Sequence, residues 1–135
     1  MFRAILETIV HFFRGGVKSG SRREVKTPLP KICYPSLVIK TDRIANQDIG
    51  QSDFFCQQHN NKYKWVMFRC PCHCGDVITL SLQPIHTPSW KLSLSEEKRP
   101  TLYPSVWRDS GCYSHFWVKD GRVFWCLNTG NDPRL

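Results

Sequence analysis

The chain has 135 residues, of which 41% are hydrophobic and 13% are aromatic. This composition is sufficient for one small domain with a hydrophobic core, and it excludes a disordered tail. No apolar run reaches the roughly eighteen residues that a transmembrane helix requires. The net charge of +8 is concentrated in residues 1–31, where seven Lys and Arg residues accompany two Glu residues and give +5.

The first residues predict an amphipathic helix followed by a basic linker. Apolar side chains recur with helical spacing over residues 2–13, and charged side chains occupy the opposite face. A Gly-Gly pair ends the helix, and the sequence up to residue 31 is basic and polar. Three interpretations of the helix are open: docking on its own domain or a protein partner, contact with an anionic membrane surface, and contact with nucleic acid. Glu7 and His11 interrupt the apolar stretch that a signal peptide needs, so we expect a cytoplasmic protein.

Residues 32–135 have the pattern of a β domain. Short apolar or alternating runs predict strands, bounded by Gly, Pro and polar residues. These runs occupy residues 37–40, 63–68, 76–82, 89–94, 101–107, 114–118 and 123–127. Pro104 restricts its run to an edge or a bend, and Asp120-Gly121 fits a two-residue hairpin turn. The predicted fold class is mostly β, a small α+β protein. It consists of an N-terminal amphipathic helix followed by antiparallel hairpins that zinc stabilises.

Two thiol-rich turns are the basis for predicting zinc. Cys70, Cys72 and Cys74 alternate in a turn that contains proline and ends at glycine, and Cys112 is followed three residues later by His115. Thiolates and imidazoles at such spacings are the usual ligands of Zn²⁺. Residues two apart in an extended run bridge poorly, and the seven cysteines are an odd number, so disulfides are disfavoured. Five candidates exceed the four ligands of a closed structural site, so one of them is a spectator or an outer partner.

The last hairpin extends the set of candidate ligands by one residue. If Asp120-Gly121 forms the loop, Lys119 pairs with Arg122, and continuing the count places His115 opposite Cys126. The thiol of Cys126 is then either a sixth group near the metal or a small buried hydrophobic side chain.

Several motifs occur in an order that resembles a known protein family. They are FRCPCHCG at 68–75, PSW at 88–90, TLYPSVW at 101–107, GCYSHFW at 111–117 and GRVFW at 121–125. This order is similar to that of small bacterial zinc-site proteins encoded beside bacterial ubiquitin-like conjugation genes, and it covers roughly residues 65–126. The resemblance implies an accessory role in ubiquitin-like modification, in phage defence, with components of the conjugation system as protein partners. The family usually has glycine where this chain has His73, which adds a possible ligand.

The metal chemistry favours a binding protein over an enzyme. A thiolate-rich shell donates charge to zinc and weakens it as a Lewis acid, which is typical of a structural site. The enzymatic alternative is a zinc-, Ser- or Cys-dependent hydrolase or peptidase that acts on ubiquitin-like conjugates. Its candidate residues are Ser105, Ser114 or an unligated cysteine as nucleophile, His73 or His86 as base, and Asp76 or Asp109 as proton carriers or histidine orienters.

A third interpretation is a module that binds single-stranded nucleic acid. Aromatic residues alternate with Lys and Arg along the β region, as in surfaces that stack bases and contact phosphates. The same aromatic residues are also what a small zinc-stabilised sheet needs to fill its core. They are Trp65, Phe68, Trp90, Trp107, Phe116, Trp117, Phe124 and Trp125.

Overall fold

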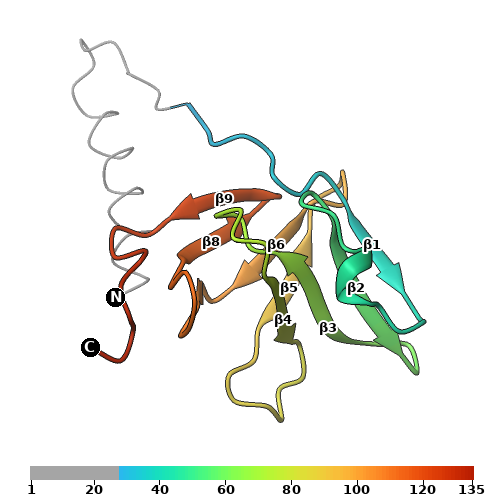
Figure 1. Ribbon diagram of the computed structural model, residues 1–135. Helices are drawn as coiled ribbons and strands as arrows, with labels where there is room; N and C mark the ends of the chain where they lie inside the picture. The colour runs from blue at the N-terminus through green and yellow to red at the C-terminus, as the bar shows by residue number, and fades with distance from the viewer. Residues whose placement is uncertain (1–27) are drawn as a thin grey trace, which may run out of the picture. The chain divides into compact units, whose positions relative to one another are not determined.

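The computed structural model describes residues 28–135, and its nine strands all fall within Lys31–Leu135 (Figure 1). The predicted N-terminal helix lies outside the described residues. Within residues 28–135, no helix has the length and hydrophobicity needed to cross a bilayer. The β class predicted from the alternating runs is confirmed for this part of the chain.

The first half of the β domain forms a four-stranded sheet. Its strands are β1 (Leu37–Lys40), β2 (Phe54–His59), β3 (Lys62–Arg69) and β4 (Val77–Ser81), in the order β1-β2-β3-β4. β2, β3 and β4 pair in antiparallel fashion, as predicted, whereas β1 runs parallel to β2. A parallel neighbour requires a long connection, and residues 41–53, which include a short 3-10 helix at Asn46–Asp48, provide it.

The second half contributes two smaller sheets. β5 (Lys91–Leu94) and β6 (Pro100–Tyr103) form one antiparallel pair, and β7 (Val106–Trp107), β8 (His115–Lys119) and β9 (Arg122–Trp125) form the other sheet in that order. Contacts between β6 and β8 join the two sheets. Figure 1 shows the long loop between β4 and β5 projecting from the body of the domain.

Two local predictions in this half are confirmed. Pro104 lies between β6 and β7, so the predicted bend separates two strands, and Ser105 lies at that bend. The β8–β9 hairpin has the predicted register: its paired residues are Lys119 with Arg122, Val118 with Val123, and Phe116 with Trp125.

Aromatic side chains join the sheets into one core. Tyr34, Phe54 and Phe68 are fully buried, and the ring centroids of Phe54 and Phe68 lie 4.7 Å apart. Phe68 meets Phe116 of β8 edge to face at 6.4 Å, which links the four-stranded sheet to the β8–β9 hairpin. The hydroxyl group of Tyr34 donates a hydrogen bond to the carbonyl oxygen of Arg69 at 2.8 Å, at the end of β3.

The aromatic residues considered for nucleic-acid stacking are mostly part of this packing. Phe68, Phe116 and Trp117 are buried, four others are half-buried, and Trp125 is 45% exposed. The core therefore accounts for most of the aromatic content of the β domain.

The tip of the β8–β9 hairpin packs against the start of the domain, which makes Gly121 sensitive to substitution. Gly121 has a φ angle of 71°, its carbonyl oxygen accepts the N–H groups of Cys33 and Tyr34, and an added Cβ would collide with the Tyr34 carbonyl oxygen. We expect Gly121→Ala to lower the free energy of unfolding by about 3 kcal/mol or more, from a strained φ angle and an unavoidable clash.

Chemical denaturation measures this loss, and Gly130→Ala is the matched control. Gly130 has a φ angle of 90°, but no atom lies within 4 Å of its added Cβ. Its replacement carries only the backbone strain, about 1–2 kcal/mol. Equal losses of unfolding free energy in Gly121→Ala and Gly130→Ala would show that the clash with Tyr34 does not contribute to the loss at Gly121.

Candidate functional site

Four of the five predicted metal ligands come together in one cluster. The sulfur atoms of Cys70, Cys72, Cys74 and Cys112 all lie within 4.8 Å of one another. The Sγ of Cys70 is 3.4 Å from that of Cys72 and 3.7 Å from that of Cys112, and the Sγ atoms of Cys74 and Cys112 are 3.9 Å apart. A tetrahedral ion with metal–sulfur bonds of about 2.3 Å requires sulfur separations of about 3.8 Å. The four thiols therefore fit a tetrahedral metal site.

The turn between β3 and β4 delivers three of these thiols. Cys70 follows the last residue of β3, and its N–H group donates to the carbonyl oxygen of Asp76 at 2.9 Å, which closes the turn. The positive φ angles of His73 and Gly75, 68° and 90°, reverse the chain between the sulfur atoms. The guanidinium group of Arg69 donates to backbone carbonyls of this turn and of residues 46 and 49, so the turn is tied to the 3-10 helix.

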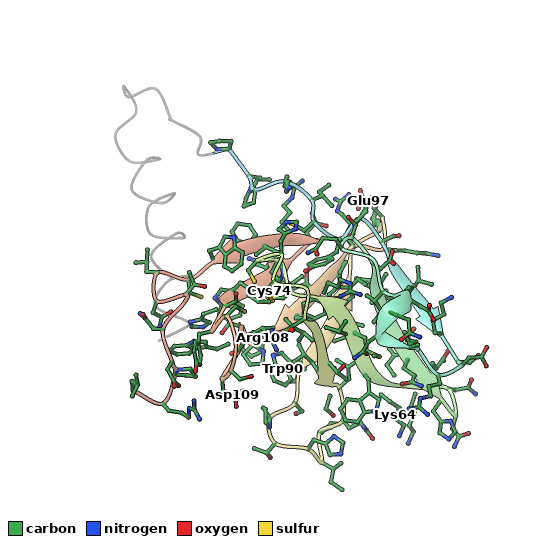
Figure 2. All side chains as sticks on the ribbon, viewed as in Figure 1. Lys64, Cys74, Trp90, Glu97, Arg108 and Asp109 are labelled. Atoms are coloured by element: carbon green, nitrogen blue, oxygen red, sulfur yellow. The ribbon has the colours of Figure 1, made fainter. Side chains whose placement is uncertain are left out.

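Cys112 comes from the loop between β7 and β8, where positive and polar groups surround it. The hydroxyl group of Ser114 donates to the Sγ of Cys112 at 3.1 Å, and the guanidinium group of Arg108 lies 3.8 Å from it. The same Arg108 nitrogen reaches Cys74 at 3.9 Å (Figure 2) and the carboxylate of Asp76 at 3.0 Å. Arg108 therefore offsets negative charge on two thiols from different turns.

The thiols of this cluster differ in acidity. Burial raises the pKa of Cys70 to about 12. Burial acts in the same direction on Cys112, but hydrogen bonds from the side chain and backbone of Ser114 lower the pKa of Cys112 to about 6. Cys112 thus ionises more readily than Cys70, and a metal that binds both thiolates must displace the proton of Cys70.

His115, the fifth predicted ligand, is not part of the cysteine cluster. Successive side chains of a strand point to opposite faces, so Ser114 faces Cys112 while His115, the first residue of β8, points away. The Nε2 atom of His115 lies 3.1 Å from the Oγ of Ser105, and its Nδ1 atom lies 2.5 Å from the Oδ1 of Asn128. Both ring nitrogens therefore have hydrogen-bonding partners outside the cluster.

Ser105, His115 and Asn128 form an array of side chains joined by successive hydrogen bonds. Ser105 is 4% exposed and His115 is fully buried, so the bond between them is shielded from water. The carbonyl oxygen of Ser105 accepts the indole N–H group of Trp90 at 3.2 Å, and the N–H group of His115 donates to the Oγ of Thr129 at 3.0 Å. Burial lowers the pKa of His115, whereas its hydrogen bond to Asn128 acts in the opposite direction. The array has the order of groups found in acyl-transfer enzymes: nucleophile, base and orienting acceptor.

The other candidates from the sequence lie elsewhere. His86 binds the Oγ of Ser81 through Nδ1 at 2.5 Å, and His73 is exposed at the tip of the β3–β4 turn. Asp76 pairs with Arg108, and Asp109 is exposed. Ser114 binds Cys112, as described above. The histidine in hydrogen-bond contact with Ser105 is thus His115, and not His73 or His86.

Cys126 is buried and remains outside the cysteine cluster. Its N–H group donates to the carbonyl oxygen of His115 at 2.9 Å, as the hairpin count predicts, and burial raises the pKa of its thiol. This environment matches the alternative of a small buried hydrophobic side chain.

Sequence reasoning missed Asn128, and it considered Trp107, Arg69 and Arg108 only as residues of a nucleic-acid surface. Asn128 follows the last strand in a polar segment whose composition suggests only a turn. The Trp107 ring stacks on His115, and this was signalled only by the pairing of β7 with β8. The two arginines bind backbone or sulfur atoms that only the folded turns bring within reach.

Comparison with protein families connects these two sites to one group of proteins. Residues 40–126 match the family model described as "Bacterial ubiquitination-like system serine protease (BubE)". The match includes Ser105, His115 and the four clustered cysteines, whereas Asn128 follows two residues after its end. No curated protein and no solved structure matches the chain. Because the match spans more than half of the sequence, the chain belongs to the BubE family of bacterial ubiquitination-like systems.

Proposed function

We propose that this protein is a serine protease that cleaves acyl bonds made by a ubiquitin-like protein. Ser105 is the nucleophile, His115 the general base and acid, and Asn128 the residue that orients the histidine. The description of the BubE family supports the reaction class. The proposal takes up the enzymatic alternative from the sequence, with a different base beside Ser105.

The observation that carries this proposal is the pair of hydrogen bonds on the two nitrogens of His115. Asn128 accepts a hydrogen bond through Oδ1, so the Nδ1 atom of His115 carries the proton and Nε2 presents its lone pair to Ser105. The Oγ–Nε2 distance of 3.1 Å is within the range for direct proton transfer.

The reaction follows from these contacts. His115 Nε2 takes the Ser105 proton as Oγ attacks the substrate carbonyl carbon and forms a carbon–oxygen bond. The imidazolium then gives this proton to the leaving amine nitrogen as the scissile carbon–nitrogen bond breaks, which leaves an ester on Ser105. Water then gives a proton to the same Nε2 atom and attacks the ester carbon. The imidazolium returns that proton to the Ser105 Oγ as the acyl carbon–Oγ bond breaks, which releases the carboxylic acid and the free serine hydroxyl.

The burial of Ser105 restricts the shape of the substrate that can reach it. Ser105 is only 4% exposed, so a slender extended chain reaches it more readily than a folded surface does. The tail of a ubiquitin-like protein, joined to its target through its terminal carboxyl group, is such a chain. Proteins modified in the ubiquitination-like system are therefore the substrates that we propose.

We also propose that the cysteine cluster holds a structural Zn²⁺ through Cys70, Cys72, Cys74 and Cys112. Four thiolates leave no open position for water, so the ion would supply a cross-link between the β3–β4 turn and the β7–β8 loop. The chemistry at the scissile bond belongs to Ser105 and His115. The cross-link would help to hold His115 in place, because Trp107 and His115 flank the loop that carries Cys112.

A fluorophosphonate probe tests the assignment of the nucleophile. This probe phosphonylates a serine only when a neighbouring base activates the hydroxyl group. We expect peptide mass spectrometry of the labelled full chain to find the adduct on Ser105, and we expect Ser105→Ala to remove it. Ser81→Ala is the matched control, because Ser81 is also a buried serine beside a histidine. Labelling of Ser105→Ala at the rate of the natural chain would overturn the proposal.

The pH dependence of the reaction follows from the environment of His115. The base must be neutral, and burial lowers the pKa of His115. We therefore expect kcat/KM to be constant at neutral pH and to fall tenfold per pH unit below an apparent pKa that is lower than the usual histidine value. Initial rates across the acid range measure this limb, with tryptophan fluorescence to verify that the chain remains folded. An apparent pKa above the usual value contradicts the assignment.

A further inference from the structure

Trp107 and His115 form the tightest ring stack of the described residues. Their ring centroids are 4.2 Å apart and their planes differ by 2°, whereas the other aromatic pairs in residues 28–135 are 4.7–6.4 Å apart. Aromatic pairs usually prefer offset or edge-to-face contacts at longer distances. One face of the imidazole is therefore covered by an indole ring.

Two independent features hold the indole in this position. Trp107 is the cross-strand partner of His115 in the β7–β8 pair, so both side chains project from the same face of the sheet. The indole Nε1–H group also donates to the carbonyl oxygen of Asn131 at 3.0 Å. Asn131 belongs to the segment after β9 that also contains Asn128. This segment therefore holds the His115 ring directly through Asn128 and holds the indole that covers the ring through Asn131.

The stack affects two properties that a catalytic histidine needs, a fixed orientation of its ring and a stable protonated form. The hydrogen bonds to Ser105 and Asn128 define the in-plane direction of the imidazole, but they resist rotation out of that plane only weakly. A parallel indole ring blocks this rotation on one side. The negative face of the indole also attracts a cation, so it favours the imidazolium that forms when Ser105 loses its proton.

We propose that Trp107 is a positioning residue for acyl transfer, which holds the His115 ring in line with Ser105 and stabilises its protonated form during the reaction. This inference rests on the proposed function. Trp107 acts through His115 and affects the chemical step rather than the binding of substrate.

Steady-state hydrolysis of p-nitrophenyl acetate by the full chain tests the role of Trp107. This small ester needs less space around Ser105 than a protein substrate does. We expect Trp107→Leu to lower kcat about tenfold with KM nearly unchanged, and Trp107→Phe, which keeps an aromatic face, to recover part of the loss. Trp125→Leu is the matched control, because Trp125 is a half-exposed indole of the same sheet that contacts Phe116 instead of His115. We expect it to retain the natural kcat.

A spectroscopic measurement separates positioning from general stability. An indole ring shifts the signals of protons above its face upfield, so the His115 ring protons should move downfield in Trp107→Leu and less so in Trp107→Phe. The signals of the His115 ring are identified as those that disappear from the NMR spectrum of His115→Gln. A wild-type kcat in Trp107→Leu, or equal losses in the Leu and Phe variants, would overturn the proposal. Should Trp107→Leu fail to fold, Trp107→Phe alone decides, with a partial loss of kcat at constant KM expected and an unchanged kcat contradicting.

Ser105→Ala keeps the two proposals distinguishable. If this variant hydrolyses the ester as fast as the natural chain, the proposed function is wrong and the role of Trp107 is wrong with it. If Ser105→Ala is inactive while Trp107→Leu is fully active, only the role of Trp107 is wrong.

Discussion

Replacing Ser105 or His115 by alanine is expected to lower kcat by about a millionfold, because each removal disables the same proton transfer. Ser105→Ala removes the proposed nucleophile, and His115→Ala removes the only imidazole in hydrogen-bond contact with it among the described residues. The two side chains act as a unit, so the double variant should be no less active than either single variant. Initial rates with a ubiquitin-like substrate of the system measure the three variants.

Asn128→Ala extends the same test. In the proposed mechanism the amide of Asn128 sets the tautomer and direction of His115 without touching the substrate, so we expect its loss to reduce kcat by up to about ten-thousandfold and to leave KM unchanged. Ser81→Ala again serves as the control. Losses from Ser105→Ala and His115→Ala that multiply in the double variant would argue that the two residues act independently, against a shared proton transfer.

Removal of the metal is expected to unfold the β domain. Metal binding in small domains contributes folding free energy on the order of 10 kcal/mol, which is comparable to the whole stability of a domain of this size. Chelation and Cys72→Ser should therefore both abolish the cooperative thermal transition of the full chain. Elemental analysis should return one zinc per natural chain and none for Cys72→Ser.

Two variants make this prediction specific. Cys33 lies outside the cysteine cluster, so Cys33→Ser should retain the metal and the natural melting temperature. His115→Ala should also retain its zinc while it loses activity, because the imidazole points away from the thiols. Loss of zinc from His115→Ala would return this histidine to the ligand set, and an unchanged melting temperature after chelation would contradict a structural metal.

Much of the fold could be predicted because its signals are local. The Asp120-Gly121 turn specifies its own hairpin, and counting outward from it gives the observed register of β8 and β9. The thiol-rich turn was correctly placed between β3 and β4 because alternating runs flank it. The parallel pairing of β1 with β2 has no such signal, since alternation reports burial of a face and not the direction of a neighbouring strand.

The candidate site could be predicted only in part. Spacing placed the four cysteines together, but it also assigned His115 to them, because a Cys-x-x-His pair in one loop usually shares a metal. The start of β8 at His115 turns that side chain to the opposite face, toward Ser105. The partner at Nδ1 could not be foreseen, since Asn128 lies in a short polar segment and reaches the histidine only after the hairpin has formed.

The segment after β9 has a practical consequence for anyone who shortens this chain. Residues 128–131 supply the acceptor for the histidine and the anchor for the indole above it, yet they form no strand and follow the end of the family match. A truncation after Cys126 would keep all three sheets, the thiol cluster, the serine and the base. Such a product should keep a β-type circular dichroism spectrum while both proton transfers by His115 slow, so that spectrum alone does not report an intact site.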